Sequence, residues 1–126
     1  MSQSNKDVDA TYTISEDLST KQFYFMKIGT SDNSALLNDT KGGNVLGILQ
    51  DDPDNSNTTR GRIRNGAGSK IKLSGTVALG GEIISETDGT GIAKDAAAQH
   101  VVGVASQAGV TGDIIEMVFQ HRDSHA

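Results

Sequence analysis

The chain has 126 residues, of which 35% are hydrophobic and 4% aromatic, and it contains no cysteine. This length suits a single domain with a small core, and the lack of cysteine excludes a disulfide framework, a thiolate metal site and a cysteine nucleophile. The net charge of −5 argues against binding to nucleic-acid phosphates. The polar start predicts that no signal peptide is present, and no apolar run reaches the length that spans a membrane.

Residues 1–20 are polar apart from isolated apolar side chains. Such a segment predicts either a terminus without fixed structure or an extended arm that orders on a partner. The piece from Tyr12 to Ile14 predicts one edge strand. We therefore expect an N-terminal arm at residues 1–20, a single β-domain at residues 21–120 and a polar, frayed tail at residues 121–126.

Runs rich in β-branched and aromatic residues, separated by Gly, Asn and Asp, predict an all-β domain. The expected strands cover residues 21–28, 45–50, 60–64, 69–74, 76–79, 82–86, 91–94, 101–105 and 114–119. The first of these is apolar on both faces, which predicts a strand covered on both sides. The Asp-Gly step at residues 88–89 predicts a hairpin. The last two strands lie in the most apolar stretch of the chain and are expected to be central and buried.

Two segments of the chain resemble each other. Residues 44–50 read Asn-Val-Leu-Gly-Ile-Leu-Gln, and residues 100–106 read His-Val-Val-Gly-Val-Ala-Ser. Each precedes a turn and a second predicted strand, which indicates two similar hairpins packed face to face unless the likeness is chance. The central Gly47 and Gly103 predict a close backbone approach or a bulge.

The sequence contains no arrangement of residues typical of catalysis. Gly66–Lys70 resembles a phosphate loop, but its Ser precedes the Lys and a strand follows. The acidic residues 51–57 lack the central Gly and closing Glu of a calcium loop. His100, His121 and His125 lie in different segments, so we expect no metal site and no cofactor. These observations predict a protein that is not an enzyme.

Arg60, Arg62 and Arg64 alternate along one predicted strand, so they share one face. One interpretation is a solvated edge whose like charges discourage edge-to-edge aggregation. The other is an ionic contact with an acidic neighbouring subunit, because guanidinium groups bind carboxylates through two parallel hydrogen bonds.

From about Leu18 to Phe119 the chain resembles the small decoration (cement) proteins of the capsids of tailed bacteriophages and prophages. The similarity begins with Leu-Ser-Thr-Lys-Gln-Phe-Tyr-Phe at residues 18–25 and continues with Val-Leu-Gly-Ile-Leu-Gln at 45–50 before Pro53. It extends through residues 73–81, 83–85 and 88–89 and closes with the pair of segments at 101–105 and 112–118.

The resemblance implies a compact β-sandwich or small β-barrel (β-tulip-like) with an extended N-terminal arm. It implies a structural virion protein that is made in the bacterial host cytoplasm, binds the outer surface of an expanded capsid and clamps neighbouring major capsid subunits. The implied partners are the major capsid protein and further copies of this chain, as a homotrimer at three-fold positions or a homodimer at two-fold positions. Neither nucleic acid nor a membrane is an implied partner.

Candidate residues for contact with the capsid or a neighbouring subunit are Tyr12, Ile14, Arg60, Arg62 and Arg64. Deletion of residues 1–18 is expected to weaken lattice binding and to leave the domain folded.

Two other functions compete with this interpretation. A phage tail or fibre module that recognises a host surface glycan would present aromatic side chains in loops, whereas the aromatic residues here lie in predicted strands. A biotinyl or lipoyl carrier domain would place a lysine at the tip of its hairpin, where this chain has Asp88 and Gly89.

Overall fold

The structure is a computed structural model that describes residues 9–14, 18, 20–51 and 60–123. This part of the chain folds entirely into β-strands and loops, and it holds no helix that could cross a membrane. The strands are β1 Asp9–Ile14, β2 Phe25–Ile28, β3 Ser34–Leu37, β4 Gly47–Leu49, β5 Arg60–Arg64, β6 Gly68–Lys72, β7 Glu82–Ser85, β8 Gly91–Ala93, β9 His100–Ala105 and β10 Ile114–Asp123. The predicted all-β fold class is confirmed.

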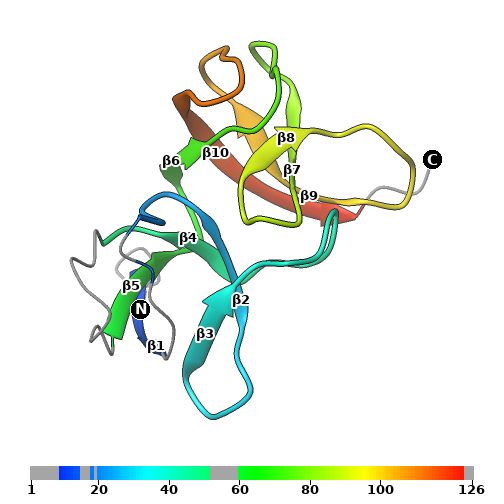
Figure 1. The fold of residues 1–126 in the computed structure, drawn as a ribbon. Helices are drawn as coiled ribbons and strands as arrows, with labels where there is room; N and C mark the ends of the chain where they lie inside the picture. The colour runs from blue at the N-terminus through cyan, green and yellow to red at the C-terminus, as the bar shows by residue number, and fades with distance from the viewer. Residues whose placement is uncertain (1–8, 15–17, 19, 52–59, 124–126) are drawn as a thin grey trace, which may run out of the picture.

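The ten strands form two five-stranded units, one stacked on the other (Figure 1). In the lower unit of Figure 1, β1-β3-β2-β4-β5 close into a barrel. In the upper unit, β6-β10-β9-β7-β8 form a second sheet. Paired strands run antiparallel except β1 and β3, which run parallel.

The two units repeat the same strand order. If the strands of each unit are numbered one to five along the chain, their order across the unit is three, two, four, five and one in both cases. In the barrel the first and third strands pair in parallel, with Ile14 opposite Ala35. At the same place in the second sheet there is a single parallel bridge between Leu73 and Gly91. The chain is therefore a structural tandem repeat, and the likeness seen in two sequence segments extends to all ten strands.

The repeated hairpins agree in register. In the β4–β5 hairpin Ile48 lies opposite Arg64, and in the β9–β10 hairpin Val104 lies opposite Val118. Each of these pairs directly follows the central glycine of its segment, Gly47 in one hairpin and Gly103 in the other. The prediction of two similar hairpins is confirmed.

Both central glycines permit a close approach of two backbones. A Cβ atom on Gly47 would lie 2.3 Å from the carbonyl oxygen of Arg64. A Cβ atom on Gly103 would lie 2.3 Å from the carbonyl oxygen of Val118. No side chain fits at such a distance, so the predicted close approach is confirmed at both positions.

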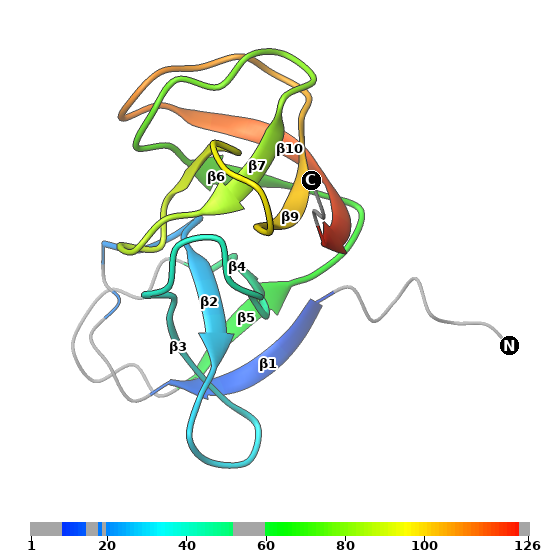
Figure 2. The ribbon, with the colours of Figure 1, turned by 90° about the vertical axis from the view of Figure 1, so that its right-hand side faces the viewer.

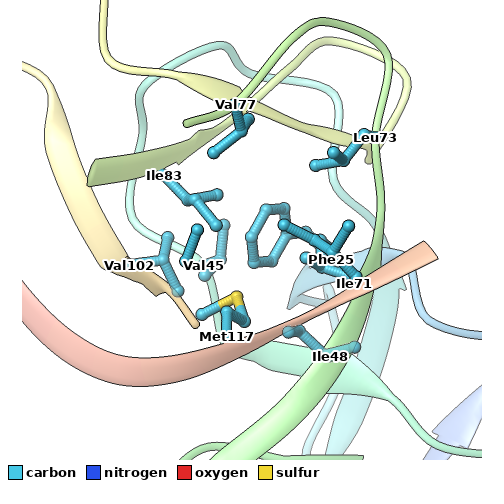
Figure 3. Packing of buried hydrophobic residues seen from close by; sticks show 11 residues of the cluster. Phe25, Val45, Ile48, Ile71, Leu73, Val77, Ile83, Val102 and Met117 are labelled. Carbon is cyan, nitrogen blue, oxygen red and sulfur yellow. The ribbon is translucent and has the colours of Figure 1, made fainter. Parts of the chain in front are cut away.

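One hydrophobic core joins the two units (Figure 3). Figure 3 shows the Phe25 ring of the barrel in the middle of side chains from the second sheet. The buried members of this core are Phe25, Val45, Ile48, Ile71, Leu73, Val77, Ile83, Val102, Ala105, Ile115 and Met117. Because both units contribute to it, each unit stabilises the other.

Strand β4 and the first two residues of β2 are buried on both faces. Phe25 and Ile48 point into the shared core, whereas Met26 and Leu49 belong to a second cluster in the barrel. All four side chains are 0% exposed. The prediction that residues 21–28 are covered on both sides is confirmed only at Phe25 and Met26, because residues 21–24 and Lys27 are half-buried and Ile28 is 63% exposed. The contact of these strands with two clusters explains why neighbouring residues in each of them are both apolar.

The described part of the predicted arm belongs to the barrel. Residues Asp9–Ile14 form β1, which pairs with β3 on one side and β5 on the other (Figure 2). It is therefore not the edge strand that the sequence predicted at Tyr12–Ile14. Leu18 is also buried, so we now expect deletion of residues 1–18 to open the barrel. Residues 1–8 lie outside the described part of the chain.

The other differences from the predicted elements are local. The tail was expected from residue 121, but β10 continues to Asp123, and residues 124–126 lie outside the described residues. The first predicted strand begins only at Phe25, because Phe23 has a φ of 69°. Strand β3 lies where the sequence indicates a loop, and predicted strand 76–79 is reduced to one bridge at Val77.

We expect Gly47→Ala and Gly103→Ala each to lower the free energy of unfolding by about 1–3 kcal/mol, because the added methyl group displaces a strand. Gly75→Ala is the matched control, since its Cβ would meet Ile92 at an ordinary 3.4 Å. Urea unfolding of the three variants measures the effect. A Gly47→Ala protein as stable as the Gly75→Ala protein would contradict the close approach.

Candidate attachment surface

The arginine stripe predicted from the sequence lies on the outside of the barrel. Along β5 the exposed Arg60 and Arg62 and the half-buried Arg64 alternate with buried Gly61 and Ile63. The inward position at 61 is filled by neighbouring side chains, and a Cβ there would lie 2.3 Å from the Cδ1 atom of Ile14. Packing inside the barrel therefore turns the three guanidinium groups outward.

Arg64 is held by Asp9 of the neighbouring strand. Its Nε atom lies 2.7 Å from Oδ1 of Asp9, and its Nη2 atom donates to Oδ2 at 3.1 Å. Its Nη1 atom donates to the carbonyl oxygen of Gly68 at 3.1 Å. The hydrogen bond from Arg64 holds the pKa of the Asp9 carboxyl below its ordinary 3.8, with a smaller contribution from the charge of Arg62. Arg64 thereby ties β1, β5 and β6 together.

The other two arginines are more available to solvent. The Nε atom of Arg62 lies 3.4 Å from Oδ2 of Asp9, and its Nη2 atom lies 4.0 Å from Oδ1 of Asp51. Its side chain remains 51% exposed. Arg60 is exposed and forms no ion pair with any residue that the structure describes. Arg60 and Arg62 are therefore the members of the stripe that can reach another molecule.

The two candidate contact residues of β1 lie deeper than expected. Ile14 is 1% exposed and belongs to the barrel core, so it supports the fold and cannot form a surface contact in this structure. Tyr12 is half-buried and packs against the same core. The reason is the pairing of β1 on both sides, which a polar sequence with isolated apolar residues does not reveal.

A groove of about 400 Å³ lies beside Arg64, at the junction of the two units. It is lined by Phe23, Gln50, Arg64, Gly68, Ser69, Lys70, Ser106, Glu116, Met117 and Val118. The amide nitrogen of Gln50 donates to the carbonyl oxygen of Ile48 at 3.1 Å and to Oγ of Ser69 at 2.9 Å. The polar groups of the groove are thus partly fixed by the protein itself.

Phe23 also lines a smaller groove of about 220 Å³, together with Tyr24, Lys72 and Ile114. Its φ of 69° is uncommon for a bulky residue and costs free energy. Two backbone hydrogen bonds maintain it, from Phe23 N to the carbonyl oxygen of Leu49 at 2.8 Å and from Lys72 N to the carbonyl oxygen of Phe23 at 3.0 Å. No pattern in the sequence predicts this strained backbone at Phe23.

Positive charge continues from the stripe across both grooves. Lys70 lines the larger groove with its Nζ atom 5.7 Å from the centre of the Phe23 ring, and Lys72 lines the smaller one. We call Arg60, Arg62, Arg64, Lys70 and Lys72 the basic face. Among the described residues, the acidic side chains that accompany it are Asp9, Asp51 and Glu116. Counted over the described residues, this face therefore carries more basic than acidic side chains, whereas the chain has a net charge of −5.

The chain was compared with known proteins. No protein-family model matches it, and no curated protein matches it. Among solved structures it is similar to the N base of the head fiber gp8.5 of bacteriophage phi29, with a TM-score of 0.72. The match covers 94% of this chain and 98% of that chain at 15% sequence identity. The similarity shows that the two chains share a fold over nearly their whole length.

Asp9→Asn is expected to lower the free energy of unfolding at neutral pH by about 1 kcal/mol, because a forked ion pair is lost. The lowered pKa of Asp9 in the folded protein means that this stability is present above the ordinary pKa of 3.8 and is lost as the pH falls through the lowered value. The difference between the wild type and the variant should therefore close in acid.

Chemical denaturation at several pH values measures this difference. Asp32→Asn is the control, because Asp32 is an exposed carboxylate outside the ion pairs of the described residues. A constant difference between Asp9→Asn and the wild type from neutral pH into acid would show that the ion pair does not contribute.

Proposed function

We propose that this protein is a structural component attached to the outside of a bacteriophage head. The observation that carries the proposal is the shared fold with a head fiber base over 94% of this chain and 98% of that one. The sequence resemblance to capsid decoration proteins points to the same location. The proposed role is structural and involves no catalysis.

In finer detail, we propose that the protein binds the expanded shell and clamps neighbouring major capsid subunits. The basic face supplies the contact, because exposed guanidinium and ammonium groups complement acidic side chains on a partner. Each such contact at the edge of an interface is weak. A repeated lattice makes many of them simultaneously for an oligomer, so the affinities combine.

The partners of this proposal are the major capsid protein and further copies of this chain. A homotrimer suits a three-fold position of the lattice, and a homodimer suits a two-fold position. An ionic contact with the capsid accounts for a basic face on an acidic protein. The net negative charge of the chain discourages non-specific association with other anionic molecules.

The alternative of a glycan-binding fibre module rests on Phe23 and Tyr24, which lie in the loop before β2 and not in a strand as predicted, and which line the grooves. All five aromatic residues of the sequence are described, and each is half-buried or buried. Glycan recognition is therefore an outcome to test and not a second proposal.

The test is co-sedimentation of the purified protein with expanded and unexpanded shells. We expect saturable pelleting with expanded shells, and the ratio of protein to capsid subunits at saturation distinguishes three-fold from two-fold sites. If the protein pellets with neither shell, the proposed attachment is refuted and glycan binding is tested instead.

Removing charge from the basic face should weaken attachment. We expect Arg60→Gln/Lys70→Gln/Lys72→Gln to reduce shell affinity roughly tenfold at low ionic strength and less at high ionic strength. Lys27→Gln/Lys41→Gln/Lys94→Gln removes the same charge elsewhere and serves as the matched control. Equal binding of the two triple variants would exclude the basic face as the contact.

A further inference from the structure

We propose that Asn65 is a site of spontaneous covalent modification, at which the backbone nitrogen of Gly66 displaces ammonia from the Asn65 side chain. Both residues lie in the connection between β5 and β6, which joins the barrel to the second sheet (Figure 2). They form the one Asn-Gly step in the sequence. This inference does not depend on the proposed attachment to a phage head.

The backbone at this step leaves the attacking nitrogen accessible. Asn65 is exposed, and neither Asn65 nor Gly66 belongs to a strand. Gly66 has no side chain to hinder the approach of its nitrogen to the Cγ atom of Asn65. In the part of the chain that the structure describes, the N–H group of Gly66 donates no hydrogen bond. The nitrogen can therefore reach the preceding side chain without breaking a hydrogen bond of the fold.

The side-chain amide of Asn65 is polarised by His121. The Nε2 atom of His121 contacts Oδ1 of Asn65, and because that oxygen can only accept a hydrogen bond, Nε2 carries the proton. The Nδ1 atom of the neutral ring accepts from Nε2 of His100 at 2.9 Å. The N–H group on Oδ1 stabilises the negative charge that develops on this oxygen during attack at Cγ. The departing Nδ2 atom has no hydrogen-bond partner among the described residues.

The reaction needs only water as a co-reactant. The Gly66 nitrogen loses its proton to solvent and forms a bond with Cγ of Asn65. The bond from Cγ to Nδ2 breaks, and a proton from solvent completes the ammonia that leaves. A water molecule then opens the resulting cyclic imide. Opening at Cγ gives aspartate, and opening at the backbone carbonyl gives isoaspartate, in which the chain continues through the side chain.

Either product changes the connection between the two units. A carboxylate replaces the neutral amide beside His121, so the hydrogen bond from the ring becomes charge-assisted. Isoaspartate also adds a methylene group to the backbone between Arg64 and Gly68, which are themselves joined by a hydrogen bond at 3.1 Å. The modified chain therefore differs from the original both in its charge and in the length of this connection.

The test is mass spectrometry of the full chain during incubation at physiological pH and temperature, followed by peptide mapping. We expect the mass gain that accompanies exchange of an amide nitrogen for oxygen, located at residue 65 and present as both aspartate and isoaspartate. Asn44 is the internal control, because it is also exposed and outside the strands but precedes the β-branched Val45. We expect Asn65 to react several-fold faster than Asn44.

Two variants separate the contributions to the rate. Gly66→Ala should slow the modification several-fold, because the added methyl group hinders the nitrogen, and the φ of Gly66 is not positive, so alanine fits there. His121→Phe keeps a ring against Phe119 but removes the proton donor, and it should also slow the reaction. A faster reaction in His121→Phe would overturn the role of His121. Equal rates at Asn65 and Asn44 in the wild type would overturn the proposal as a whole.

Discussion

The fold depends on two strands that must be apolar on both faces. β2 and β4 form one wall of the barrel, and the same wall covers the second sheet. Phe25 and Met26 are neighbours in sequence, yet they belong to different hydrophobic clusters. A polar residue at either position would be buried without water, which costs several kcal/mol unless a partner is present. Each unit therefore covers apolar side chains of the other.

Two polar side chains, Arg64 and Asn65, form contacts where the chain passes from the first unit to the second. Each unit buries apolar side chains against the other. The segment from Arg64 to Gly68 connects the last strand of the first unit with the first strand of the second. Arg64 reaches across it to the carbonyl oxygen of Gly68, and Asn65 reaches to His121. Arg64 and Asn65 thus join this short connection to the second unit.

Sequence patterns predicted the elements whose signals are local. The β7–β8 hairpin follows from its Asp-Gly turn, and the β9–β10 pair follows from two strongly apolar runs; both are confirmed. β1 was predicted only as a short edge strand, because its two neighbours in the barrel are distant in sequence and only Ile14 is fully buried. The backbone conformation of Phe23 depends on tertiary hydrogen bonds, and the contact between His100 and His121 lies beside a shift of register in β10. Neither feature leaves a periodic signal in the sequence.

The same distinction applies to the arginine stripe. Alternation by two correctly places three guanidinium groups on one face, because that rule depends only on strand geometry. Alternation cannot reveal that Arg64 is engaged by Asp9 of β1, since the two residues are 55 positions apart. A stripe of equal charges in the sequence therefore contains residues of two kinds. Arg64 is engaged at the junction of the units, whereas the side chains of Arg60 and Arg62 are exposed, although Arg62 also lies near Asp9 and Asp51.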